Sequence, residues 1–238
     1  MKLHRFIGNF DLSKKPLTVS DKELVNQLKN VLRLKTGGQV ILVDNKLQEA
    51  VAEIKNLTKN SAEFEIGAIT QNEKEPAVEV TLYCALLKKE NFELVVQKAT
   101  EAGVAEIVPI LTKRTVKLSL KPDRLEKIAK EAAEQSGRGI VPKVGEIIPF
   151  EEALKHAKDF NANLFFEPGA PIFSQDRLRN SGAKRASVFI GPEGGWDDSE
   201  IEMARVHDLK VVGLGGLTLR SETAAIIASY LVANGANS

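Results

Sequence analysis

The sequence predicts two domains of different fold classes: a small β-barrel with one helix over residues 1–72 and an α/β domain over residues 78–238. Three observations predict this division. Short apolar segments separated by turn residues fill the first 72 residues, which is typical of a small barrel. A polar stretch that ends in Pro76 follows, and we expect residues 73–77 to be the linker. From residue 78 onward, strand and helix patterns alternate, which favours a parallel sheet.

The first domain has three clear strand patterns and one helix pattern. Residues 40–43 form a compact apolar run, whereas residues 50–57 and 62–69 alternate apolar and polar side chains, as half-buried strands do. The helix is expected over residues 21–34, because its apolar positions share one helical face. These positions are Leu24, Leu28, Val31 and Leu32.

The second domain begins with a strand over residues 78–86, a helix over residues 92–102 and a strand over residues 105–111. Gly103 ends this helix, and short connections between the three elements imply parallel strand pairing. The elements expected further along are a helix from Pro122 that Gly137 ends, strands over residues 163–166, 187–190 and 209–214, and helices beginning near Asp197 and Ser221.

Composition excludes several classes of protein. Hydrophobic residues make up 43% and charged residues 27% of the chain, an ordinary mix for a soluble globular protein. The N-terminal residues have no pattern of an export signal, and no apolar stretch is long enough to cross a bilayer, so we expect a cytoplasmic protein without a membrane partner. The single cysteine, Cys84, has apolar neighbours and is expected to be buried and inert, and three scattered histidines offer no metal site.

The charge is unevenly distributed, although the net charge is only +1. Residues 86–145 carry twelve Lys and Arg against eight Asp and Glu, whereas residues 146–238 carry nine against thirteen. A local basic surface on a nearly neutral protein suits a partner with phosphate groups, such as RNA. An ordinary solvated surface explains the imbalance equally well.

Two glycine-rich loops carry the candidate chemistry, and each follows an expected strand and precedes an expected helix. The first loop is Gly-Pro-Glu-Gly-Gly at residues 191–195, after which Asp197 and Glu200 form a capping-box pattern. Such a loop brings backbone N–H groups and a helix N-terminus close to a ligand at the carboxyl end of a strand. A tight turn without function is the alternative, because glycine is common in turns.

The second loop begins at Gly213 and ends in Arg220, with Ser221 as the expected helix N-cap and Glu222 in the first helical turn. A cation at this place can meet a phosphate or a developing oxyanion, and a surface arginine paired with a glutamate is the alternative. The dinucleotide pattern G-x-G-x-x-G breaks at Thr218, and the sequence contains no P-loop and no G-x-S-x-G hydrolase motif.

The two loops together resemble signature segments of the SPOUT methyltransferase superfamily. Residues 191–195 with Leu-Arg-Ser-Glu-Thr-Ala at residues 219–224 resemble the RsmE family, the 16S rRNA (uracil-1498-N3)-methyltransferases. Glu-Gln-Ser-Gly-Arg at residues 134–138 also resembles a stretch of this family, and the likeness covers nearly the whole chain, more weakly in the N-terminal part. The chain departs from the family at Gln27 and Asn91, where the family often has a histidine and a basic residue.

The resemblance implies a PUA-like RNA-binding barrel followed by a SPOUT domain with a trefoil knot. It also implies S-adenosyl-L-methionine (SAM) as the cofactor, a homodimer, and 16S rRNA in the small ribosomal subunit as the substrate. The implied cofactor-binding residues are Phe166, Glu167, Gly191, Glu193, Gly194, Gly195, Leu214, Gly215, Leu219 and Arg220.

Methylation at N3 of uridine requires the uracil anion, so cations beside the uracil oxygens favour the reaction. The candidate catalytic residues are Arg138, Arg220 and Glu222, with Glu193 as an alternative to Glu222 for relaying the proton. Simple helix capping by the glutamates and phosphate clamping by Arg138 are the other readings of these residues. The basic residues expected to contact RNA are Arg5, Arg33, Lys88, Lys89, Lys113, Arg114 and Lys117.

Two other functions stay open on the sequence. A SPOUT methyltransferase that modifies another RNA, for example at a ribose 2′-O, would bind the same cofactor and differ only in its product. A non-catalytic RNA-binding or ribosome-assembly factor would keep the fold without the transfer reaction. Residues 134–138 and the appended barrel favour uridine N3, and the intact glycine-rich loops favour an enzyme.

Overall fold

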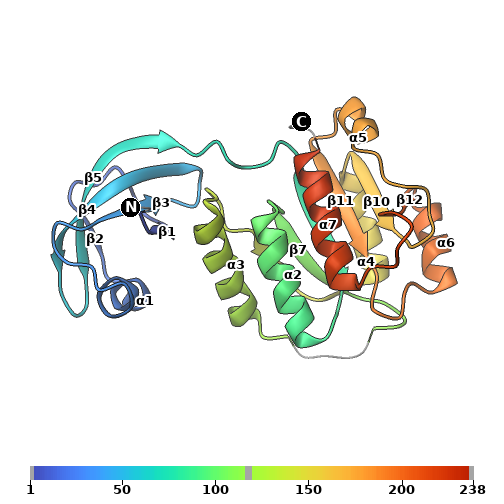
Figure 1. The fold of residues 1–238 in the computed structure, drawn as a ribbon, viewed down its shortest axis with the longest axis horizontal. Coiled ribbons are helices and arrows are strands. Elements are labelled where there is room, and N and C mark those ends of the chain that lie inside the picture. The colour runs from blue at the N-terminus through green and yellow to red at the C-terminus, as the bar shows by residue number, and fades with distance from the viewer. Residues whose placement is uncertain (1–2, 116–119, 236–238) are drawn as a thin grey trace. The chain divides into compact units, whose positions relative to one another are not determined.

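The chain forms two compact units, and the computed structural model describes residues 3–115 and 120–235 (Figure 1). The first unit comprises the chain up to residue 75 together with residues 133–141. The second unit comprises residues 76–132 and the chain from residue 142 onward. The division expected from the sequence kept residues 78–238 together, whereas here residues 133–141 cluster with the N-terminal part of the chain.

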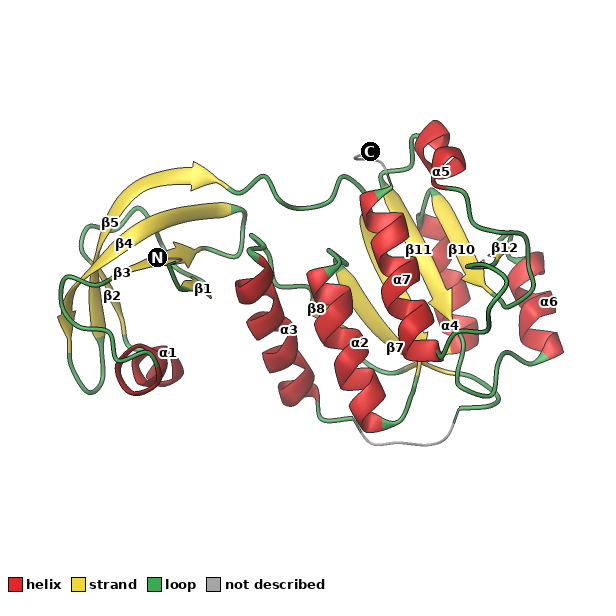
Figure 2. Cartoon of the chain, viewed as in Figure 1, coloured by secondary structure: helices red, strands yellow, loops and turns green. Residues whose placement is uncertain are grey.

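The first unit is built on a curled five-stranded sheet with the strand order β1-β3-β4-β5-β2 (Figure 2). Its strands are β1 (Arg5–Ile7), β2 (Leu17–Val19), β3 (Gln39–Val43), β4 (Gln48–Leu57) and β5 (Ala62–Gln71). β1 pairs parallel with β3, and the other pairs are antiparallel. Along β4, Ala50, Ala52 and Ile54 point into the core, which confirms the alternating pattern of a half-buried strand.

The helix of the first unit changes type along its length. α1 (Lys22–Asn26) continues directly into a π-helical turn, η1 (Gln27–Val31). Leu24 and Leu28 are buried as expected, but Val31 is 65% exposed. The prediction for Val31 is wrong because the wider π turn rotates this residue away from the face that Leu24 and Leu28 share.

The second unit contains a seven-stranded sheet in the order β12-β10-β11-β6-β7-β8, with β9 also paired to β7. Its strands are β6 (Glu79–Ala85), β7 (Glu106–Leu111), β8 (Lys143–Val144), β9 (Ile148–Pro149), β10 (Ala162–Phe166), β11 (Arg185–Ile190) and β12 (Lys210–Val212). Every pair is parallel, which confirms the parallel sheet expected from the alternation of strands and helices. β12 is shorter than expected, because Gly213 leaves β10 and pairs with Ile172 instead.

Helices cover both faces of this sheet. The helical elements after β6 are α2 (Lys89–Glu101), α3 (Pro122–Ser136), whose last residues belong to the first unit, α4 (Phe150–His156), the 3₁₀ turn η2 (Ala157–Asp159), α5 (Gln175–Ser181), α6 (Asp198–Val206) and α7 (Ser221–Asn234). α2 and α7 lie side by side, and α7 packs on β6 and β11 (Figure 1). On the opposite face, Phe150 of α4 contacts Phe165 and Phe189 of the sheet. None of the described helices combines the length and the apolar character that a membrane crossing requires.

Cys84 lies near the carboxyl end of β6 and is fully buried, as expected. Burial raises the pKa of its thiol, so the thiol stays protonated at neutral pH. A buried thiol of this kind is a poor nucleophile and a poor metal ligand, and the side chain packs as a small apolar group.

Candidate active site

A cavity of about 760 Å³ opens at the carboxyl ends of the parallel strands of the second unit. This is the edge of an α/β sheet where ligands bind, and the volume suits a cofactor-sized molecule. Residues that follow β10, β11 and β12 form its wall. Every residue that the family resemblance assigns to cofactor binding lines it: Phe166, Glu167, Gly191, Glu193, Gly194, Gly195, Leu214, Gly215, Leu219 and Arg220.

Trp196 holds the first glycine-rich loop in place. Its Nε1 donates a hydrogen bond to the carbonyl oxygen of Phe166 at 3.0 Å, and its ring centroid lies 4.3 Å from that of Phe165. A Cβ on Gly191 would lie 2.9 Å from the indole, so a side chain at this position displaces the ring or the backbone. The sequence reasoning missed this role, although a tryptophan directly after a glycine-rich loop was the available signal. Pro168, Leu217 and Thr218, which belong to the same expected loops, line the wall as well, and so does Asn91 of α2.

The helix after this loop begins with the expected capping box. The Asp197 side chain accepts from Ser199 N, and Glu200 Oε2 accepts from Asp197 N at 2.9 Å. Hydrogen bonds from Ser199, joined by Lys113, lower the pKa of Asp197 to about 2, so its carboxylate is charged at neutral pH. This negative charge attracts two basic residues, Lys113 and Arg114.

Lys113 and Arg114 lie against this loop. Lys113 Nζ lies 3.3 Å from Asp197 Oδ1, and Arg114 donates to the carbonyl oxygen of Gly194 at 3.1 Å. Both side chains are exposed, yet their polar groups already have partners in the second unit. They brace the loop, and contact with RNA, as expected from the sequence, would compete with these bonds.

The second glycine-rich loop leads into α7. Gly215 has a φ of +139°, a conformation that L-residues with a side chain rarely adopt. The N-cap of α7 is Arg220, one residue earlier than the expected Ser221, and its carbonyl oxygen accepts from Ala224 N at 2.8 Å. The Arg220 side chain is exposed on the cavity wall, and no ion pair joins it to Glu193, Glu222 or any other described residue.

Two carboxylates on the wall have an oxygen without a donor. Glu222 in the first turn of α7 is only 7% exposed, and its Oε2 accepts no hydrogen bond from a described residue. Glu167 Oε2 likewise accepts no hydrogen bond from a described residue, and burial raises the pKa of this carboxyl group. Glu193 differs, because it is exposed and its Oε1 accepts from Lys88 N at 3.3 Å. Unsatisfied buried acceptors are costly, so these two oxygens are suited to N–H or O–H donors of a ligand.

Arg138, expected at the catalytic centre, belongs to the first unit and does not line the cavity. It is 5% exposed, and its guanidinium pairs with Glu75 at 2.7 Å. The three candidate catalytic residues are therefore divided: Arg220 and Glu222 share the cavity wall, and Arg138 is held elsewhere by a carboxylate.

The other basic residues expected to contact RNA have different surroundings. Arg5 is nearly buried and forms an ion pair of 2.6 Å with a carboxylate of β4. Arg33 is exposed and has a φ of +54°, whereas Lys88 and Lys89 are exposed at the beginning of α2, with Lys88 on the cavity wall. Lys117 lies outside the described residues. Arg33, Lys88 and Lys89 are thus the members of this set with exposed side chains and no ion pair among the described residues.

A parallel α/β unit with a cofactor-sized cavity between glycine-rich loops at its strand ends is typical of cofactor-binding α/β enzymes. Comparison with known proteins gives the family. Residues 73–233 match the RNA methyltransferase domain, and residues 21–67 match the RNA methyltransferase PUA domain. The chain belongs to the family of ribosomal RNA small subunit methyltransferase E.

Relatives of that name occur in several bacteria. The Bacillus subtilis protein is 32% identical over 218 residues, covering 87% of this chain and 85% of the relative. The Mesomycoplasma hyopneumoniae protein is 34% identical over 212 residues, covering 85% and 87%. A crystal structure of ribosomal RNA small subunit methyltransferase E from Neisseria gonorrhoeae bound to S-adenosyl methionine is 30% identical, with a TM-score of 0.88 over 96% of this chain and 95% of that one.

The packing of Gly191 against Trp196 predicts a spectroscopic change. Trp196 is the only tryptophan and is 4% exposed, so its fluorescence reports the loop directly. Gly191→Ala should shift the emission to longer wavelength, because the new methyl group pushes the indole toward water. Gly216→Ala is the matched control, since a Cβ there meets nothing within 4 Å. Unchanged emission in Gly191→Ala would show that the ring does not restrain this loop.

Proposed function

We propose that this protein methylates N3 of a uridine in 16S rRNA of the small ribosomal subunit, in the cytoplasm, with SAM as the methyl donor. The observation that carries the proposal is the cavity wall. All ten residues that the family resemblance assigns to the cofactor meet there, together with Glu222. The names of the relatives and the SAM bound to the Neisseria gonorrhoeae protein support the reaction class and the cofactor.

The chemistry of the wall fits SAM. Gly195 and Gly215 leave open space where other residues would carry a side chain, so the backbone can approach a ligand closely. Leu214, Leu217 and Leu219 supply apolar surface for an adenine ring. Glu167 Oε2, which has no donor among the residues that the structure describes, is an acceptor for the hydroxyl or ammonium donors of the cofactor. When bound, SAM supplies an electrophilic methyl group on its sulfonium.

In this proposal, Glu222 and Arg220 have different roles toward the uracil ring. N3 becomes nucleophilic once its proton leaves, and Glu222 offers a buried carboxylate oxygen that accepts no hydrogen bond from the described part of the chain. Glu193 is less suited, because it is exposed and already accepts from a backbone N–H. Arg220, which forms no ion pair with a described residue, is a cation for the negative charge that develops on the uracil oxygens. The target base must leave its stack to reach these groups.

We also propose that the second unit contains the trefoil knot of the SPOUT fold. After the edge strand β12, Gly213 N donates to Pro171 O at 2.8 Å and Phe173 N donates to Gly213 O at 2.9 Å. The chain thus runs along the segment that follows β10. It then returns to the middle of the sheet, where α7 packs on β6 and β11. This path supports threading of the C-terminal segment past a loop.

A homodimer is part of the same proposal. On the adjacent helices α2 and α7, Leu94, Ile227 and Tyr230 are 39%, 37% and 58% exposed. Together they form an apolar surface close in sequence to the residues that line the cavity. Burial of this surface against a second copy removes it from water.

The product of the reaction tests the proposed function. Small ribosomal subunits lacking the modification, incubated with the protein and SAM, should yield 3-methyluridine after digestion of the 16S rRNA to nucleosides. Chromatography with mass detection identifies the nucleoside. A ribose-methylated product would keep the family and overturn the assignment to N3. No methylated nucleoside, with SAM bound normally, would favour a non-catalytic assembly factor.

Removal of the Arg220 side chain should separate chemistry from cofactor binding. Arg220→Ala should lower the methyl-transfer rate by about 10²-fold, the scale of a lost oxyanion donor. SAM affinity should change little, since the backbone and apolar groups of the wall stay in place. The rate is measured with labelled SAM, and Arg205→Ala, an exposed arginine at the end of α6, is the control. Equal loss of SAM binding and of transfer would assign Arg220 to the cofactor alone.

A further inference from the structure

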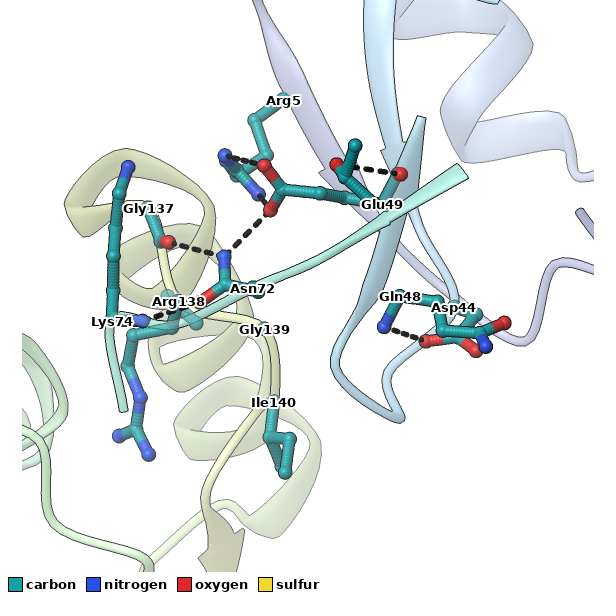
Figure 3. Close-up of polar contacts among 12 residues, drawn as sticks. Arg5, Asp44, Gln48, Glu49, Asn72, Lys74, Gly137, Arg138, Gly139 and Ile140 are labelled. Carbon is teal, nitrogen blue, oxygen red and sulfur yellow. Dashed lines mark hydrogen bonds and ion pairs between the residues drawn. The ribbon is translucent and has the colours of Figure 1, made fainter. Parts of the chain in front are cut away.

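The stretch Glu-Gln-Ser-Gly-Arg at residues 134–138 is bound into the first unit, whereas every residue that lines the cavity belongs to the second. Glu134 Oε1 accepts from Ile7 N at 2.9 Å, which completes the hydrogen bonding of a β1 backbone group. Asn72, 5% exposed, donates to the carbonyl oxygen of Gly137 at 3.1 Å and to Glu49 at 2.6 Å. Figure 3 shows Asn72 between these two partners.

The strongest of these contacts is the ion pair of Arg138 with Glu75. Arg138 Nη2 and Nε lie 2.7 and 3.1 Å from Glu75 Oε2, and the two side chains are 6% and 19% exposed. Glu75 Oε1 also accepts from Gly139 N at 2.9 Å. The planar guanidinium matches the carboxylate with two donors, which a lysine cannot do. Loss of either partner removes a charge-assisted interaction from a largely buried site.

Glu75 is the last residue of the first unit before the chain enters the second. The next residue, Pro76, packs its ring on Gly103, where no side chain fits. At this crossing, Glu75 is therefore held by Arg138 in the first unit, and Pro76 is held by packing on Gly103 in the second. No residue separates these two anchors, and the crossing lies within residues 73–77, where the sequence suggested a polar linker.

The chain returns to the second unit just after Arg138, between residues 141 and 142. Val141 N donates to Asn45 Oδ1 at 2.8 Å within the first unit. Lys143 N donates to Ala105 O at 3.1 Å within the second. This crossing is also anchored on both of its sides. The pair of Arg138 and Glu75 ties the two crossing segments to each other.

We infer that Arg138 is a positioning residue for the methylation, which acts through Glu75 by fixing the chain at these two crossings. The inference rests on the proposed function, with the added premise that the first unit, whose residues 21–67 match an RNA methyltransferase PUA domain, grips the rRNA while the second carries the cofactor. Anchored crossings leave the chain little local freedom where it passes from one unit to the other, and such pre-organisation favours productive delivery of a base. Arg138 itself touches neither the uracil nor the cofactor in this account.

A double-mutant cycle on the ion pair tests this inference. Methyl transfer to small ribosomal subunits is measured for Arg138→Met, Glu75→Gln and the double variant. If Arg138 acts through Glu75, each single change lowers kcat/KM by a similar factor, on the order of tenfold, and the double change adds little. SAM affinity stays at the wild-type value in all three. Arg124→Met, which removes a two-pronged but exposed pair with Glu93 in the second unit, should leave kcat/KM unchanged.

The pH profile distinguishes positioning from contact with the uracil. If Arg138 stabilised the uracil anion, higher pH would restore part of the lost transfer rate, because the anion then forms more readily. A rate lost through a loosened crossing is not restored by higher pH. The deficit of Arg138→Met should therefore stay constant as pH rises. Arg138→Lys keeps the positive charge and serves as the test if the methionine variant unfolds. Its loss of transfer rate should be smaller and equally independent of pH.

Recovery at high pH, or wild-type transfer by Glu75→Gln beside a defective Arg138→Met, would overturn the inference. Wild-type transfer by both single variants would overturn it as well. An inactive wild-type protein would instead contradict the proposed function.

Discussion

The hydrogen bond from Trp196 Nε1 to the carbonyl oxygen of Phe166 joins the ends of two adjacent strands, and the site depends on it. It fixes the residues after β11 against the end of β10, while the indole packs against the Phe165 ring, at an interplanar angle of 30°, inside the aromatic core. Glu167 and the first glycine-rich loop therefore approach the same space from neighbouring strands. Gly191 allows this arrangement because any side chain there would meet the indole.

Much of the fold follows from local patterns that tertiary contacts did not override. α2 lies on the sheet with the apolar face that its spacing indicates, and α3 begins at Pro122, where a missing N–H costs little. Strand order does not follow from local patterns, because β10 lies between β12 and β11 and this depends on long-range packing. Val31 was misplaced because the sequence does not reveal that the helix widens into a π turn.

The glycine-rich loops were predictable because they follow strands directly, and parallel strands end at the same edge of their sheet. The partners of charged residues were not predictable. The carboxylate that holds Arg138 lies 63 residues earlier in the chain, and Lys113 finds its partner 84 residues later. A basic residue near a functional motif can bind RNA, a reacting base or a protein carboxylate, and which of these partners it has depends on the folded structure. Here the folded chain pairs Arg138 and Lys113 internally and leaves Arg220 without an ion pair among the described residues.

The central claim is that the three loops at the strand ends of the second unit hold SAM. Amide hydrogen exchange measured by mass spectrometry with and without SAM tests it on the whole chain at once. SAM should slow exchange in residues 166–168, 190–196 and 214–222, because a bound cofactor covers these backbones and restrains the loops around them. The sheet of the first unit should exchange at the same rate in both samples. Protection confined to the first unit, or no change in these loops at saturating SAM, would contradict the account.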